Sequence, residues 1–280
     1  MPSSSKRARE LARARYERQQ QRRARRAQRQ RQRRIAVAAA GSIVVVALLV
    51  WAVAALVGGR TTTQAAAAAS ASPTASASAS TAALRCPPVS TAKPTPMSFP
   101  KAPPLSIDRS ATYQVTLDTN CGKIVMDLFP GKAPVTVNSF LFLAGKRYFD
   151  NSVCHRVTGA ADGIYVLQCG DPTGTGNGGP GYTFGIENAP ANGDYPAGTV
   201  AMARTSDPNS NGSQFFIAYQ DTKLPTTGGG YTIFGKVVSG LDIVAKIGAA
   251  GPDPTRPPYP KIPIQIQSIS VVKLAKGATS

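Results

Sequence analysis

Short runs of alternating hydrophobic and polar residues fill the part of the chain that begins at residue 111. Alternation with a period of two predicts β-strands that bury one face. In the last run, Ile262, Ile264 and Ile266 alternate before the phase shifts to Ile269, which predicts a β-bulge. The predicted strands are Tyr113–Leu117, Lys123–Phe129, Val153–Val157, Ile164–Cys169, Thr199–Ala203, Gln214–Ala218, Tyr231–Val237 and Ile262–Val272.

Two further segments, residues 134–145 and 241–248, repeat apolar side chains every three or four positions. That spacing is typical of one face of an α-helix. Pro134 suits the first position of the first helix, and Gly145 ends it. Many short strands with two helices and glycine-rich turns predict an antiparallel barrel or sandwich with helical caps.

Residues 35–57 form a long, predominantly apolar run upstream of this globular part. The run carries no charge and is long enough to cross a bilayer as a helix. Arg33 and Arg34 lie directly before it and Trp51 lies towards its far end, as expected for a single-pass membrane segment with a cytoplasmic N-terminus. We therefore expect a cell-membrane protein whose C-terminal domain lies outside the cytoplasm. A cleaved signal peptide is the alternative interpretation of this run.

The N-terminal arm, residues 1–34, contains fourteen Lys and Arg residues and two Glu, and so carries most of the formal net charge of +18. It has almost no apolar face and cannot build a core. We interpret it as a cytoplasmic topology signal that also attracts anionic lipid headgroups. Binding of nucleic acid by the arginine block is the alternative, and the apolar run that follows argues against it.

Residues 58–110 change composition again, from Ala, Ser and Thr to frequent prolines. Such a segment buries too little apolar surface to order itself, and prolines favour extended backbone. It therefore predicts a linker that holds the domain away from the membrane. The domain itself is expected over residues 111–275, followed by a short tail at 276–280.

All four cysteines, Cys86, Cys121, Cys154 and Cys169, follow the predicted membrane segment. An even number of cysteines in an oxidising compartment predicts disulfides, and four cysteines allow three pairings. Cys154 and Cys169 flank a predicted strand–loop–strand unit, so we favour that pair. Cys86 and Cys121 would then tie the linker to the domain. Four unpaired thiols are the alternative.

The sequence lacks the motifs that are usual in serine hydrolases, in nucleotide-binding enzymes with a phosphate-binding loop, and in metalloenzymes. It contains one histidine and no Gly-x-Ser-x-Gly motif. The glycine-rich stretch at 174–181 lacks the Lys-Ser/Thr ending of a phosphate-binding loop, so we interpret it as a flexible surface loop. His155 follows Cys154, but a metal site needs several converging ligands. We therefore expect neither a metal nor a cofactor.

Three blocks of sequence carry a resemblance to a known family. They are CHR at 154–156 with LQCGD at 167–171, NSNGSQFFIA at 209–218, and FGKVVSGLDIVAKI at 234–247. In this order and spacing they resemble the cyclophilin family, and the resemblance covers nearly all of residues 111–273. It implies a mainly β fold, a closed antiparallel β-barrel capped by two α-helices. It also implies a cofactor-independent peptidyl-prolyl cis/trans isomerase that acts on proline-containing polypeptides.

The resemblance assigns catalytic roles to Arg156, which matches the family's essential arginine, and to Gln168 beside it. These residue types suit the reaction, because rotation about an X–Pro bond breaks no covalent bond and needs no nucleophile. A catalyst needs an apolar pocket for the proline ring and a cation that favours the twisted amide. The substrate-binding positions that the resemblance implies are His155, Tyr165, Val166, Ala203, Gln214, Phe216, Leu224 and Tyr231.

Some positions depart from the family pattern. The stretch between Arg156 and Gln168 is longer than usual, which leaves the register of Tyr165 and Val166 open by one residue. Lys223 stands where many members have tryptophan, so we expect weak inhibition by cyclosporin. Residues 204–207 replace an asparagine-containing turn. A membrane-tethered peptide-binding or chaperone module with little isomerase activity therefore remains the alternative function.

Overall fold

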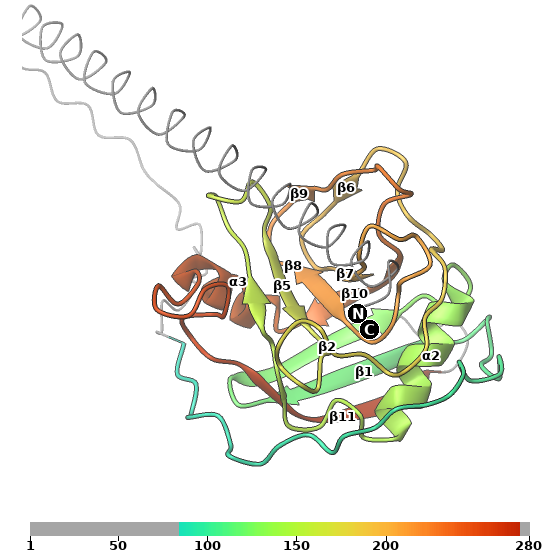
Figure 1. The fold of residues 1–280 in the computed structure, drawn as a ribbon, viewed down its shortest axis with the longest axis horizontal. Coiled ribbons are helices and arrows are strands. Elements are labelled where there is room, and N and C mark those ends of the chain that lie inside the picture. The colour runs from blue at the N-terminus through green and yellow to red at the C-terminus, as the bar shows by residue number, and fades with distance from the viewer. Residues whose placement is uncertain (1–83, 275–280) are drawn as a thin grey trace, which may run out of the picture. The chain divides into compact units, whose positions relative to one another are not determined.

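A nine-stranded antiparallel sheet organises the part of the chain that the computed structural model describes, residues 84–274 (Figure 1). The strand order is β3-β11-β1-β2-β10-β7-β8-β5-β4. The strands of this sheet are β1 (Thr112–Thr119), β2 (Gly122–Leu128), β3 (Ser152–Val153), β4 (Arg156–Val157), β5 (Val166–Cys169), β7 (Thr199–Met202), β8 (Phe215–Ala218), β10 (Ile233–Ser239) and β11 (Gln265–Leu274). A separate two-stranded ribbon consists of β6 (Asp194–Tyr195) and β9 (Thr222–Lys223).

Each predicted strand has a counterpart in the sheet, and both predicted helices are present as α2 (Pro134–Gly145) and α3 (Leu241–Ala250). One prediction needs correction, because Val153–Val157 is not a single strand. The amide of Cys154 donates to Ile264 O at 3.0 Å, and the amide of His155 donates to Gln168 O at 3.1 Å. The chain thus changes partner from β11 to β5 within two residues. The ribbon strands β6 and β9 were not predicted, because two residues are too short to show alternation.

The sheet curls so that its two edge strands, β3 and β4, are consecutive in the chain. The expected closed barrel is therefore a curled sheet whose ladder of strand pairs does not form a complete ring. The predicted bulge in the last strand is confirmed. Asp118 pairs with Ser268 but Thr119 pairs with Ile266, which leaves Gln267 as the extra residue.

The main hydrophobic core lies between the curled sheet and the two helices, which flank it on opposite sides (Figure 1). Alternate residues of β1 and β2, such as Leu117 and Met126, point into it and are almost completely buried. Helix α2 contributes Phe140, whose ring stacks on Phe149 at a centroid distance of 5.0 Å. Helix α3 contributes Ile247. Burial of each large apolar side chain contributes about 1.5–3 kcal/mol.

Residues 84–110, hereafter the strap, run along the surface of the domain and contain no helix or strand. They belong to the segment that the sequence predicted as linker. A disulfide joins Cys86 to Cys121, and the amide of Ser90 donates to Gln265 Oε1 at 2.8 Å. Further along, the amide of Phe99 donates to the carbonyl oxygen of Pro180 at 2.8 Å. The strap is thus attached to the domain at several points.

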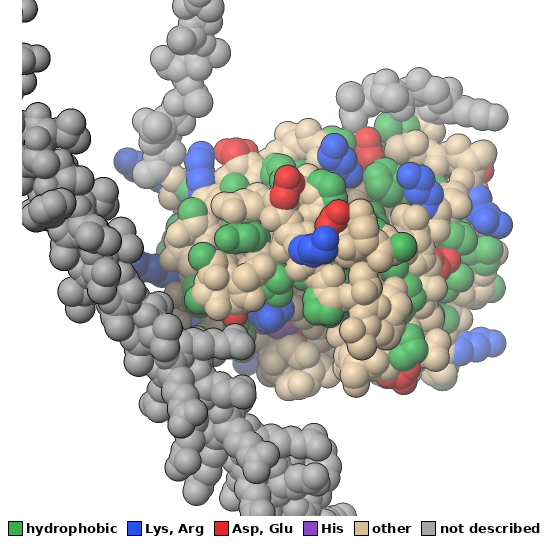
Figure 2. Space-filling model, turned by 90° about the horizontal axis from the view of Figure 1, so that it is seen from above, with side chains coloured by type: hydrophobic (Ala, Val, Ile, Leu, Met, Phe, Trp, Pro, Cys, Tyr) green, Lys and Arg blue, Asp and Glu red, His purple; other side chains and the backbone are tan. Residues whose placement is uncertain are grey.

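Within residues 84–274, no helix has the length and hydrophobicity needed to cross a bilayer. The predicted membrane segment at 35–57, the basic arm at 1–34 and the tail at 276–280 lie outside the described residues. On the face of the domain seen in Figure 2, acidic and basic side chains are interspersed with neutral and apolar ones.

Candidate functional site

One row of side chains crosses four neighbouring strands on a single face of the sheet. In the strand register Arg156 on β4 is opposite Gln168 on β5, Gln168 is opposite Phe216 on β8, and Phe216 is opposite Ala201 on β7. Directly paired residues point to the same side of a sheet. Three separate segments of the chain, 154–156, 167–171 and 209–218, therefore bring a cation, an amide and an aromatic ring next to one another.

Hydrogen bonds fix the orientation of the polar members of this row. Arg156 Nη1 donates to Gln168 Oε1 at 3.3 Å, and Gln168 Nε2 donates to Gln214 Oε1 at 2.8 Å. Gln214 Nε2 in turn donates to the carbonyl oxygens of Gly176 and Gly178, each at 2.9 Å. A guanidinium has five N–H donors, so the bond to Gln168 leaves Arg156 several donors for a substrate. Arg156 and Gln168 are both half-buried.

A buried carboxylate holds the glycine-rich loop that receives these bonds. Asp171 is completely buried and accepts hydrogen bonds from the amides of Thr173 at 2.7 Å, Gly176 at 2.6 Å and Gly178 at 3.1 Å. Burial by itself raises the pKa of Asp171, but the hydrogen bonds from the Thr173 hydroxyl and from these amides outweigh it and hold the pKa below its usual value. The loop at 174–181, predicted to be flexible, is therefore tied to an ionised carboxylate.

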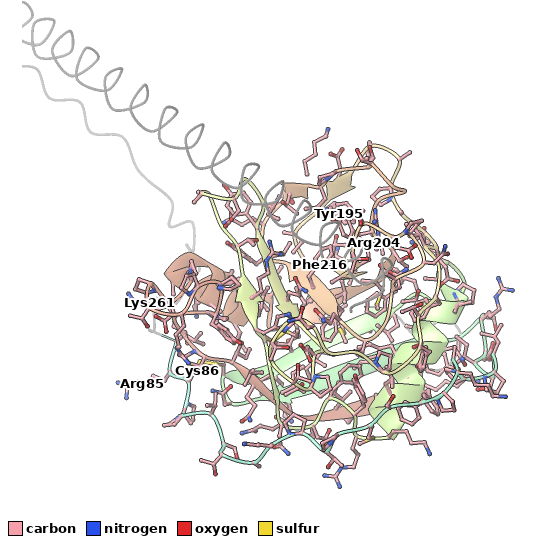
Figure 3. The ribbon with its side chains drawn as sticks, viewed as in Figure 1. Arg85, Cys86, Tyr195, Arg204, Phe216 and Lys261 are labelled. Carbon is pink, nitrogen blue, oxygen red and sulfur yellow. A yellow bond between two sulfur atoms is a disulfide. The ribbon has the colours of Figure 1, made fainter. Side chains whose placement is uncertain are left out.

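An apolar cluster separate from the main core includes Phe216 and Ala201, the apolar end of the row. Its buried members are Val166, Tyr195, Ala201, Phe216 and Leu224, with Ile164, Ala203, Tyr231 and Ile233 packed against them. Figure 3 shows Tyr195 and Phe216 close together, and their ring centroids are 6.1 Å apart. Tyr231 meets the Phe216 ring edge-on at 5.8 Å. The cluster thus brings together five of the predicted binding residues, namely Val166, Ala203, Phe216, Leu224 and Tyr231.

The structure does not bring Tyr165 into this cluster. Its side chain packs against the main core and meets the Tyr219 ring edge-on at 5.9 Å. Neighbouring positions in extended backbone point to opposite faces, so Val166 and Tyr165 cannot both face the cluster in the same way. Ile164 contributes there instead, and sequence reasoning missed it. It also missed Tyr195, because a two-residue strand carries no periodic signal.

His155 is buried, with 4% of its surface exposed, and lies beneath the glycine-rich loop rather than on the surface of the site. A Cβ added at Gly176 would lie 3.4 Å from the imidazole Cδ2. Among residues 84–274 neither ring nitrogen has a hydrogen-bond partner. Burial lowers the pKa of His155, while the neighbouring Asp171 acts in the opposite direction. The imidazole is therefore neutral at neutral pH.

Both favoured disulfides are present, Cys86–Cys121 and Cys154–Cys169. The second one adjoins the row, because Cys154 lies two residues before Arg156 and Cys169 directly follows Gln168. It covalently joins the two neighbouring chain segments at one end of that pair. In the described part of the chain, no group of three or more His, Cys, Asp or Glu residues is placed to hold a metal ion.

This geometry suits chemistry in which charge shifts without a bond being broken. An oriented cation lies in the same cross-strand row as the Phe216 ring of the apolar cluster. A partly desolvated cation interacts more strongly with developing charge than an exposed one. The roles of Arg156, Gln168 and the binding residues remain predictions from the family resemblance, and the arrangement is compatible with them.

Comparisons with known proteins agree on one family. The family model described as cyclophilin type peptidyl-prolyl cis-trans isomerase matches residues 114–271. The probable peptidyl-prolyl cis-trans isomerase B of Mycobacterium leprae is 40% identical over 194 residues, which are 64% of each chain. Its Mycobacterium tuberculosis counterpart is 42% identical over 171 residues, or 56% of this chain and 54% of that protein. The matches thus span less than two thirds of these relatives.

A solved structure is also similar. The crystal structure of a Cryptosporidium parvum cyclophilin type peptidyl-prolyl cis-trans isomerase aligns with a TM-score of 0.50 and 32% identity. The alignment covers 59% of this chain and 99% of that one. The family model covers more than half of the chain, and the chain belongs to the cyclophilin-type peptidyl-prolyl cis-trans isomerase family.

Proposed function

We propose that this chain accelerates cis/trans isomerisation of X–Pro bonds in proteins outside the cytoplasm and so assists their folding. The observation that carries the proposal is the position of Arg156. It is hydrogen-bonded to Gln168 and lies in one cross-strand row with Phe216, at the edge of the separate apolar cluster. Membership of the family gives independent support.

The mechanism follows from the electronic structure of the amide. Resonance gives the bond a rotation barrier of about 18–20 kcal/mol. As the bond twists, resonance is lost and the lone pair of the prolyl nitrogen becomes able to accept a hydrogen bond. With the proline ring on the cluster around Phe216, Arg156 donates to the prolyl nitrogen, the preceding carbonyl oxygen or both. These bonds are stronger in the twisted state than in either planar state, so they accelerate rotation in both directions.

Gln168 acts through Arg156. Its Oε1 accepts a hydrogen bond from Arg156 Nη1, and its Nε2 donates a hydrogen bond to Gln214. The guanidinium is therefore oriented before a substrate binds. A hydrogen bond to a charged group contributes about 1.5–3 kcal/mol. At about 1.4 kcal/mol for each factor of ten, one such bond made only in the twisted state supplies a ten- to hundredfold acceleration. Transfer of the bond from water to the apolar cluster would supply a further part.

The extracytoplasmic location rests on separate observations. The apolar run at 35–57 follows directly on Arg33 and Arg34, as in a membrane segment with a cytoplasmic N-terminus. The two disulfides are typical of an oxidising compartment. A tether of this kind would hold the isomerase close to chains that emerge from the membrane, with lipid as a partner of residues 1–57.

The activity is tested with the purified full-length chain and a short peptide that contains one X–Pro bond. Exchange between the cis and trans forms is measured by nuclear magnetic resonance, with and without a catalytic amount of protein. Acceleration over the uncatalysed exchange, which takes tens to hundreds of seconds, is expected. Binding of the peptide without acceleration would replace the proposal by the peptide-binding module.

The location is tested with intact cells that express the chain with a different epitope tag at each end. Protease added outside the cytoplasmic membrane, after removal of any outer layers, should cleave the C-terminal tag and leave the N-terminal tag intact. Protection of both tags, or loss of the N-terminal one alone, would contradict the proposed topology without affecting the proposed activity.

A further inference from the structure

The glycine-rich loop at 174–181 forms a wall between two cavities. One, of about 620 Å³, reaches Gln168 and Gln214 of the candidate site. The other, of about 550 Å³, is bounded on its far side by the strap. Gly179 lines both cavities. Because both faces of the loop adjoin cavities, few side chains pack against its middle, and its position depends on hydrogen bonds and on the attachment of its ends.

On its inner side the loop supports the candidate site. Gln214 Nε2 donates to the carbonyl oxygens of Gly176 and Gly178, each at 2.9 Å. Gln214 Oε1 in turn accepts from Gln168, whose own Oε1 accepts from Arg156. Hydrogen bonds weaken steeply when donor and acceptor lose alignment. A displacement of the loop is therefore transmitted along this series of bonds to the guanidinium.

On its outer side the end of the same loop is held by the strap. The amide of Phe99 donates to the carbonyl oxygen of Pro180 at 2.8 Å. The next residue, Gly181, lies directly against the strap backbone. A Cβ added at Gly181 would collide with the Ser98 hydroxyl and lie 2.7 Å from Phe99 O, so a residue with a side chain would force the two segments apart. The strap and the loop thus fix each other's position through backbone contacts.

The strap is also anchored to the domain at this point. The Phe99 ring meets Phe142 on α2 edge-on at 5.0 Å, and Phe99 and Met97 both pack against the main core. In Figure 1 the strap, drawn in blue-green, passes below β11 and reaches α2. The Cys86–Cys121 disulfide lies well before Phe99 in the chain and is not part of this contact. Phe99 therefore joins the loop to α2 without help from that disulfide.

We propose that Phe99 is a positioning residue of this enzyme. Anchored on α2, it holds the glycine-rich loop where the loop fixes Gln214, and Gln214 in turn orients Arg156 through Gln168. This inference rests on the isomerase function proposed above and makes part of the predicted linker a component of the enzyme. Loss of the support should lower kcat/KM about three- to tenfold, the effect of one neutral hydrogen bond.

The first test compares Phe99→Ala, Phe99→Leu and Ile107→Ala in the full-length chain. Ile107 is the matched control, because it is a half-buried strap residue that packs against the main core but lines a cavity beside α2 that the glycine-rich loop does not reach. The kcat and KM are measured from the exchange of an X–Pro peptide. Phe99→Ala should lower kcat and leave KM nearly unchanged, because Arg156 contributes most in the twisted state. Phe99→Leu should recover part of the loss, and Ile107→Ala should change neither constant.

A second variant approaches the same contact from the loop. Gly181→Ala should displace the strap and lower kcat as Phe99→Ala does. Gly251→Ala is its control, because Gly251 also has a positive φ, +71° against +90° at Gly181, but an added Cβ meets no atom within 4 Å. Gly251→Ala should leave kcat unchanged. An equal loss in both variants would trace the effect to backbone strain and overturn the proposal.

Hydrogen exchange measured by mass spectrometry separates positioning from a general loss of stability. Phe99→Ala should speed exchange over residues 172–181 more than in β1 and β2, and Ile107→Ala should show no such excess in the loop. An equal increase over the whole domain, an unchanged kcat in folded Phe99→Ala, or an equal loss of kcat in Ile107→Ala would overturn the proposal and leave the isomerase function intact. Failure of the unaltered protein to accelerate exchange of the peptide would instead remove the proposed function itself.

Discussion

Gln168 lies directly opposite Arg156 in the ladder between β4 and β5, and its Oε1 accepts a hydrogen bond from Arg156 Nη1 at 3.3 Å. The backbone thus places the two side chains next to each other before any substrate arrives. The opposite end of the Gln168 amide is held by Gln214. The orientation of the catalytic candidate therefore depends on a network that extends to the glycine-rich loop.

Replacement of Gln168 by leucine tests this network. Leucine has a side chain of similar size but can neither accept a hydrogen bond from Arg156 nor donate one to Gln214. Because a hydrogen bond to a charged group contributes about 1.5–3 kcal/mol, kcat/KM should fall about tenfold or more. Circular dichroism and the melting temperature should change little, since Gln168 is half-buried. An unchanged rate would mean that Arg156 needs no such support.

His155 gives a prediction about pH. Its pKa in the folded protein is lowered by burial, so between that value and about 6.5 the unfolded chain binds more protons than the folded one. Stability should therefore be full above pH 6.5 and decrease as the pH falls. His155 is the single histidine of the chain, so His155→Leu should remove this component. The check is the midpoint of urea unfolding between pH 5 and pH 8, where equal slopes for both proteins would speak against the assignment.

The Cys154–Cys169 disulfide should matter for both stability and catalysis. It closes a loop with a sequence separation of 15, for which the chain-entropy relation gives about 3 kcal/mol. For a chain of this size that corresponds to a decrease in melting temperature of roughly 6–12 °C. We expect Cys154→Ala with Cys169→Ala to show this loss and a lower kcat, because the disulfide braces the backbone around Arg156 and Gln168. The Cys86→Ala, Cys121→Ala protein is the control, since that disulfide attaches the strap and not the site. If the control lost as much kcat, the brace would have no specific role.

The periodicity of apolar residues predicted the strands and both helices, because it is a local property of the sequence. The three cyclophilin-like sequence blocks predicted most of the residues that cluster around Phe216, because these blocks occur in the order typical of the family. Tyr165 was expected to line the substrate pocket, with its register open by one residue, and the structure packs it against the main core and not in that cluster. The long connection between Arg156 and Gln168 hides the register, and a shift of one residue moves a side chain to the opposite face. Tyr195 was missed because it reaches the cluster from a two-residue strand.

Other features depend on contacts between residues far apart in sequence. The sequence around Asp171 (GDPTG) is typical of a turn, yet three amides of the following loop donate hydrogen bonds to its carboxylate. The strap looked like a linker, because its prolines and polar residues resemble those of disordered segments. Only the folded structure shows that the amide of Phe99 donates a hydrogen bond to the carbonyl oxygen of Pro180. No local pattern encodes such pairings.

The strap provides a fourth prediction. Phe99 is half-buried, and its ring meets Phe142 on α2 edge-on at 5.0 Å. Phe99→Ala should lower the free energy of unfolding by about 1–3 kcal/mol and speed proteolytic cleavage within residues 84–110. Val272→Ala is a suitable control, because Val272 is 57% exposed and its truncation removes little buried surface. Limited proteolysis with equal cleavage rates for both variants would show that the strap is not held at Phe99.

The role of Arg156 is the central claim, and its substitution tests that claim most directly. The exchange rate of an X–Pro peptide should be measured for the full-length chain, Arg156→Ala and Arg156→Lys under identical conditions. We expect Arg156→Ala to lose about ten- to a hundredfold in kcat/KM, as for one charged hydrogen bond made only in the twisted state, while its melting temperature stays within a few degrees. Arg156→Lys should recover only part of the loss, because a lysine cannot keep the same hydrogen bond geometry. A folded Arg156→Ala protein with near-normal turnover would contradict the account.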